Sequence, residues 1–84
     1  MLIKVLAAEG NLSSASNVDS ASVVRLYNGH SAALVITRKD SGGTTIGTFT
    51  MPGNTVEVVE KKSTEAIFAA NAAVLGAAVG YTIS

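Results

Sequence analysis

Apolar and polar residues alternate along much of this 84-residue chain. Alternation with a period of two over four to eight residues is typical of β-strands with one buried face. Three such segments lie in the middle of the chain, separated by the glycine-containing segments Lys39–Gly43 and Met51–Asn54. The pattern predicts a β-meander, with consecutive antiparallel strands at Ala33–Arg38, Thr44–Met51 and Thr55–Lys61.

The two connecting segments contain residues that are typical of tight turns. Glycine adopts a positive φ at little steric cost, which favours a turn at Gly42 and Gly43. Pro52 and Gly53 suit the two central positions of a type II turn, in which the second position has a positive φ. Backbone geometry therefore explains these residues without any functional role.

The strand predicted at Ala33–Arg38 is unusually apolar. Leu34 and Ile36 are expected to face the core, and Val35 points to the opposite face of the strand. Apolar residues on both faces indicate a strand that is covered on both sides. We expect that cover to be a second sheet or a neighbouring molecule.

Two further strands are predicted before this centre, at Leu2–Ala7 and Ser22–Tyr27. The segment Ala8–Ser16 is rich in Ser, Asn and Gly and is interpreted as a loop. Leu12 and the nearby Val18 are expected to hold this loop against the body of the protein.

The C-terminal segment has no charged residue from Ala66 onwards and its pattern is ambiguous. Helix-capping residues precede it, whereas its second half alternates as a strand does. We predict a helical turn or ordered loop near Thr64–Phe68 and a final strand from about Ala73 to Ile83. A third interpretation is a small membrane protein with a transmembrane helix over residues 66–83, although no basic residue follows to anchor it.

Together these elements predict a single all-β domain over residues 1–84. The expected fold is a small antiparallel β-sandwich or a partly open barrel of about seven short strands, with one helical turn near residues 64–68. A chain this short buries only about two-thirds of its unfolded surface, so its core is small. The N-terminus lacks the pattern of a signal peptide, and we expect it to form the first strand.

Composition indicates a surface that favours association. Six basic and six acidic residues give a net charge of zero, and charged residues are only 14% of the chain, against about 25% in an average protein. Proteins with little net charge tend to associate, because nothing keeps their surfaces apart. Either partners cover part of this surface, or the surface consists of uncharged small residues.

No catalytic, cofactor or metal site is predicted. The chain has no cysteine and one histidine, which excludes disulfides and metal sites built on thiolates or several histidines. His30 and Asp40 could form a triad with a serine, but Asp and Ser in turns usually serve turn geometry. We therefore expect a protein that is not an enzyme, with no cofactor and no small-molecule substrate.

Nucleic-acid binding is not predicted either. It would require a basic stripe with stacking aromatic residues. The basic residues instead form two isolated pairs, Arg38 with Lys39 and Lys61 with Lys62, each next to an acidic residue. We expect these pairs to lie at strand ends, where charge discourages unwanted strand pairing.

Five segments resemble a group of small proteins of about this length encoded by tailed phages, notably phages that infect cyanobacteria. The segments are Ala21–Asn28, Ala33–Thr37, Gly47–Met51, Lys61–Ile67 and Val74–Thr82. The resemblance implies a β-sandwich that serves as a virion structural protein, a decoration or cement protein that stabilises the capsid by non-covalent contacts. The alternative is a tail, baseplate or fibre module that binds a host surface.

The resemblance also implies partners and a location. The partners would be the major capsid protein and copies of the chain itself, with no nucleic acid and no membrane. The protein would be made in the host cytoplasm and would lie on the capsid surface. From apolar residues near chain ends and loops, we predict an interface that contains Leu2, Ile3, Tyr27, Phe68 and Tyr81.

Overall fold

The computed structural model describes residues 2–82, which form eight β-strands and no helix. This confirms the all-β class. The eighth strand, beyond the predicted seven or so, is a two-residue element inside the predicted loop. In chain order the strands are β1 (Leu2–Val5), β2 (Gly10–Asn11), β3 (Val23–Asn28), β4 (Leu34–Lys39), β5 (Thr45–Met51), β6 (Thr55–Glu60), β7 (Ala66–Phe68) and β8 (Val74–Thr82).

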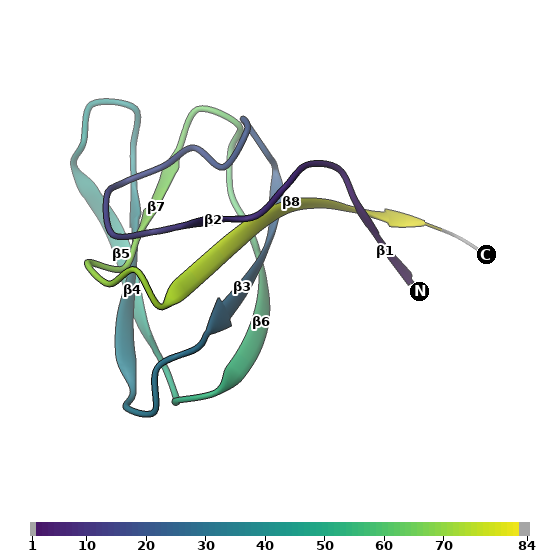
Figure 1. Ribbon diagram of the computed structural model, residues 1–84. Helices are drawn as coiled ribbons and strands as arrows, with labels where there is room; N and C mark the ends of the chain where they lie inside the picture. The colour runs from purple at the N-terminus through teal and green to yellow at the C-terminus, as the bar shows by residue number, and fades with distance from the viewer. Residues whose placement is uncertain (1, 83–84) are drawn as a thin grey trace.

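The described strands form two antiparallel sheets that pack face to face, as Figure 1 shows. The first sheet has the order β1-β8-β3-β6, and β2 also pairs with β8. The second sheet has the order β5-β4-β7. The predicted antiparallel β-sandwich is therefore confirmed.

The core lies between the inner faces of the two sheets. On β3 the predicted alternation holds, because Val24 and Leu26 are fully buried. Leu12 and Val18 are also buried and hold the N-terminal loop against the body, as predicted. Ile36 of β4 packs into the same cluster.

The predicted meander is wrong, because β5 and β6 belong to different sheets. β4 pairs with β5 as expected, but β6 pairs with β3 along its whole length, from Val23 opposite Glu60 to Asn28 opposite Thr55. The chain thus crosses from one sheet to the other at Met51–Asn54. A local apolar pattern predicts strands but does not select their partners, and here the more distant β3 is the partner of β6.

The crossover does not form the predicted type II turn. The positive φ, 58°, belongs to Asn54 and not to Gly53. Glycine is required at position 53 for another reason. A Cβ atom there would lie 2.3 Å from the carbonyl oxygen of Ser31, so only glycine allows the two loops to approach this closely.

The helical turn predicted near residues 64–68 is also wrong. A tight turn, closed by a 3.0 Å hydrogen bond from Glu65 N to the Lys62 carbonyl, leads into β7. β7 pairs with β4, where it gains ladder hydrogen bonds, and this pairing decides against a helix. β8 confirms the final strand, although Ile83 lies outside the described residues.

No helix in residues 2–82 is long and apolar enough to cross a membrane. The segment proposed above as a transmembrane helix instead forms β7, a turn and β8.

The described chain covers β4 on one face only, so the expected cover of its other face by a neighbouring molecule stays a prediction. Ile36 is buried, but Val35 points away from the core and is 54% exposed. Within the chain, the first sheet covers only the inner face of β4.

Candidate interaction site

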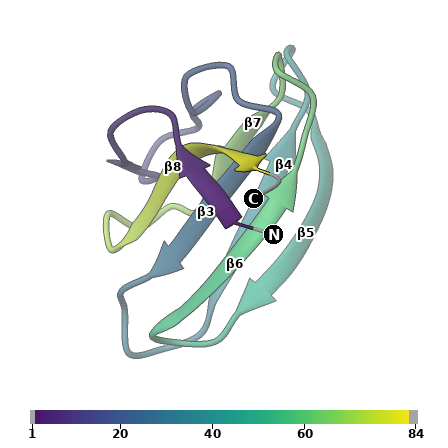
Figure 2. The same ribbon diagram turned by 90° about the vertical axis from the view of Figure 1, so that its right-hand side faces the viewer.

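The N-terminal strand and the end of β8 project from the body as a two-stranded arm in Figure 1, and Figure 2 views the molecule from the side on which this arm lies. We define the arm as residues 2–6 together with residues 79–82. β3 pairs with β8 only from Val74 to Ala78, whereas β1 pairs with β8 from Val79 to Thr82. In the part of the chain that is described, the arm therefore has no third strand beside it.

The arm exposes apolar side chains on both faces. The register places Ile3 opposite Tyr81, and Val5 follows on the same face. Leu2, Lys4 and Leu6 alternate with them and point to the other face. Lys4 is the one charged residue in the sequence of the arm. The exposed fractions are 61% for Leu2, 39% for Ile3, 66% for Val5, 58% for Leu6 and 52% for Tyr81.

Such an arm is energetically unfavourable in water. Fully burying a side chain of this size contributes about 1.5–3 kcal/mol, and monomeric soluble proteins rarely expose large contiguous apolar patches. The arm is therefore the strongest candidate for an interface with another molecule.

The structure brings together three of the five predicted interface residues and separates the other two. Leu2, Ile3 and Tyr81 lie in the arm. Tyr27 lies on the outer face of the first sheet and is half-buried, whereas Phe68 lies on β7 in the second sheet. The Lys39 ammonium group lies 4.6 Å from the centre of the Phe68 ring, a cation–π contact within the chain.

Val5 and Leu6 complete the arm, and sequence reasoning did not include them. Leu2–Leu6 is apolar at every position except Lys4. This two-faced apolar run was a usable signal, since a strand with one face in water would alternate.

A second feature is an apolar cleft of about 270 Å³ where the sandwich is open between β5 and β6. The strands that border it belong to different sheets and are not hydrogen-bonded to each other. Its lining is mainly apolar and includes two charged residues. The lining residues are Ile36, Gly47, Thr48, Phe49, Val59, Ile67, Arg38 and Glu60. Phe49 was expected to pack in the core or at its rim, and its 38% exposure places it at the rim.

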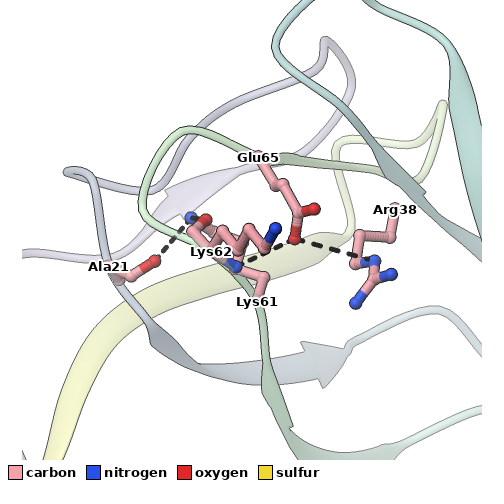
Figure 3. A network of polar contacts seen from close by, with 5 residues as sticks. All are labelled: Ala21, Arg38, Lys61, Lys62 and Glu65. Atoms are coloured by element: carbon pink, nitrogen blue, oxygen red, sulfur yellow. Dashed lines mark hydrogen bonds and ion pairs between the residues drawn. The ribbon is translucent and has the colours of Figure 1, made fainter.

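A polar cluster ties the end of β6 to the opposite sheet (Figure 3). Lys61 is 3% exposed, and its Nζ donates to the carbonyl of Ala21 at 2.5 Å and to that of Lys62 at 3.2 Å. The Glu65 carboxylate accepts from Lys62 N at 2.8 Å and lies 3.8 Å from Arg38 Nε. Lys61 is thus buried and does not serve as the exposed strand-end charge that its sequence position predicted.

The buried lysine of the cluster has a shifted pKa, and its hydrogen bonds are satisfied. Burial lowers the pKa of Lys61, and the nearby Glu65 carboxylate partly offsets this effect. No buried side-chain nitrogen or oxygen of the described residues lacks a hydrogen-bond partner. These contacts therefore have a structural role, since they hold the end of β6 against the second sheet.

The residues considered for catalysis have identifiable local contacts. Asp40 Oδ1 accepts hydrogen bonds from Gly42 N and Thr44 N, both at 2.9 Å, which confirms its place in turn geometry. His30 Nδ1 accepts from Ala32 N at 3.0 Å. Residues 2–82 contain no group of three or more His, Asp or Glu side chains suited to a metal ion.

Comparisons of the chain with protein-family models, with curated proteins and with solved structures gave no match.

Proposed function

We propose that this chain is a virion structural protein that decorates and stabilises a phage capsid by non-covalent contacts. The observation that carries the proposal is the apolar arm, which projects from a compact body and has one charged residue. The resemblance to small proteins of tailed phages supports the same role. Its partners are the major capsid protein and copies of itself.

A decoration protein must bind a repeated surface without chemistry. A rigid sandwich with a projecting apolar strand suits this task, because burial of a few side chains provides a contact at each lattice position. Symmetry repeats this contact over the shell. Several weak contacts then act together through effective concentration, so no single contact needs high affinity.

The experiment that tests the proposal is localisation in virions of the encoding phage. Purified virions labelled with gold-conjugated antibodies against this chain are viewed by electron microscopy, and its copy number is measured by quantitative mass spectrometry. We expect label over the head and a copy number in a fixed ratio to that of the major capsid protein. Label on the tail or baseplate, or absence from virions, would overturn the proposal.

A further inference from the structure

The arm and the cleft are complementary features of one chain. The arm presents apolar side chains that are 39–66% exposed at residues 2, 3, 5, 6 and 81, and the cleft presents an apolar lining that remains open between two strand edges. We propose that the arm of one copy docks into the cleft between β5 and β6 of a second copy. This inference builds on the proposed function, because it names one of the partners that an assembled structural protein requires.

The size of the cleft favours a side chain over a small molecule. Small-molecule pockets usually have volumes of about 300–1,000 Å³ and several convergent polar groups. This cleft has about 270 Å³ and an apolar lining, enough for one or two aliphatic side chains. The edges of β5 and β6 also offer backbone groups to which a strand can add, as in β-augmentation.

Charge selects the face of the arm that enters the cleft. Lys4 shares its face with Leu6, and neither Lys4 nor Glu60 at the rim of the cleft has an ion-pair partner in residues 2–82. Arg38, the basic residue of the cleft, is already paired with Glu65 at 3.8 Å. Glu60 is therefore the charged residue of the lining that has no ion-pair partner in residues 2–82. We place Lys4 beside Glu60 and the Leu6 side chain in the cleft, which leaves Ile3 and Tyr81 for a capsid partner.

Cysteine cross-linking tests this contact, because the chain has no cysteine of its own. Lys4→Cys and Glu60→Cys variants are mixed in equal amounts and oxidised mildly, and the products are identified by mass spectrometry. Random pairing of the two variants would make the mixed disulfide half of all disulfides formed. Because a disulfide requires Cα atoms about 4.4–6.8 Å apart, docking that places residues 4 and 60 side by side should raise the mixed disulfide above that half. A mixture of Lys4→Cys with Lys62→Cys, at an exposed position outside the cleft, is the control. Equal yields from the two mixtures would overturn the proposal.

Filling the cleft is an independent test. A Cβ atom at Gly47, in the cleft lining, would meet no atom within 4 Å, so Gly47→Leu adds an apolar side chain to the lining without a clash at Cβ. Gly10→Leu, on β2 and equally unobstructed, is the matched control. In sedimentation measurements over a range of concentrations, we expect Gly47→Leu to weaken self-association at least tenfold and Gly10→Leu to resemble the unmodified chain. Similar behaviour of the two variants, or a monomeric unmodified chain at all concentrations, would overturn the proposal.

The two proposals fail separately. A chain that labels the phage head but remains monomeric in solution disproves docking of the arm into a second copy and retains the decoration role. A chain that associates through arm and cleft but labels the tail retains the docking and disproves the decoration role.

Discussion

At the scale of single residues, Asn28 joins the two sheets where the chain crosses between them. Its side chain is completely buried, and Nδ2 lies 3.1–3.2 Å from the carbonyl oxygens of Ala32, Met51 and Pro52. Its Oδ1 accepts from His30 N at 2.9 Å. These contacts bind backbone groups of the loop after β3, of the last residue of β5 and of the crossover that follows it.

We expect Asn28→Ala to lower the free energy of unfolding by about 1–3 kcal/mol, because buried backbone groups would lose their partners. The measurement is the midpoint of urea unfolding followed by circular dichroism. Asn28→Asp retains the shape and removes the Nδ2 donor, and should be destabilising to a similar or greater degree. A change below about 0.5 kcal/mol for both variants would show that water replaces these contacts.

Lys61 is the second residue whose burial has a measurable consequence. Its pKa is lowered below the usual 10.5 by burial. Between the lowered pKa and 10.5, the unfolded chain binds more protons than the native state, so this lysine makes stability rise with pH in that range. Below the lowered pKa both states are protonated, and the contribution is constant.

We expect the stability difference between the unmodified protein and Lys61→Met to shift in favour of the unmodified protein as the pH rises from neutral to 10.5. Urea unfolding at several pH values gives the free energy of unfolding of both proteins. The other titrating groups are common to both, so their contributions cancel in the difference. Lys62→Met, at the exposed neighbouring position, is the control and should change stability by less than about 0.5 kcal/mol. A difference that stays constant, or that shifts in favour of Lys61→Met as the pH rises, would contradict the prediction.

At the scale of elements, the crossover from β5 to β6 decides how the sandwich is assembled. It packs beneath the loop after β3, where Asn54 N donates to the His30 carbonyl at 3.1 Å. Gly53 allows this approach, since any Cβ would overlap the backbone of Ser31. The sheet change therefore depends on close loop packing and not on a special turn type.

Gly53→Ala is expected to lower the free energy of unfolding by about 1–3 kcal/mol, the usual cost of overpacking. Gly42→Ala is the matched control, because its Cβ would make only an ordinary contact, 3.4 Å from Asp40 Oδ1. Thermal unfolding of both variants gives the comparison. Equal melting temperatures for the two variants would mean that the loop after β3 moves aside freely.

At the scale of the whole molecule, the body and the arm have separable roles. The core lies between the two sheets, whereas the arm extends beyond them. Substitutions at the exposed arm positions should therefore affect association and leave folding almost unchanged.

Val5→Lys and Val35→Lys test this separation with the same substitution at two exposed positions, 66% and 54% exposed. We expect both variants to retain stability within about 0.5 kcal/mol. Only Val5→Lys should lose binding to capsids that lack the chain, by tenfold or more, because docking would bury an unpaired charge. Co-sedimentation with such capsids measures the effect. Loss of binding for Val35→Lys alone would move the interface to the outer face of β4.

Local patterns in the sequence by themselves determined the strands and several of their details. Alternation located the strands after residue 20 except β7, because the pleat places successive side chains on opposite faces. The buried pair Val24 and Leu26, the loop residues Leu12 and Val18, and the turn around Asp40 follow from the same local rules. These features depend on neighbouring residues alone, so sequence is sufficient for them.

Only the tertiary structure decided which strands pair and which surfaces stay exposed. β6 pairs with β3 across a change of sheet, Lys61 is buried by a loop distant in sequence, and β1 extends beyond the body as part of the arm. Each outcome depends on contacts between segments that are far apart in the chain. The free energies of such contacts cannot be predicted from a local sequence pattern. The candidate interface was therefore predictable in part: Leu2, Ile3 and Tyr81 were named from the sequence, but the arm that unites them comes from the register of β1 on β8.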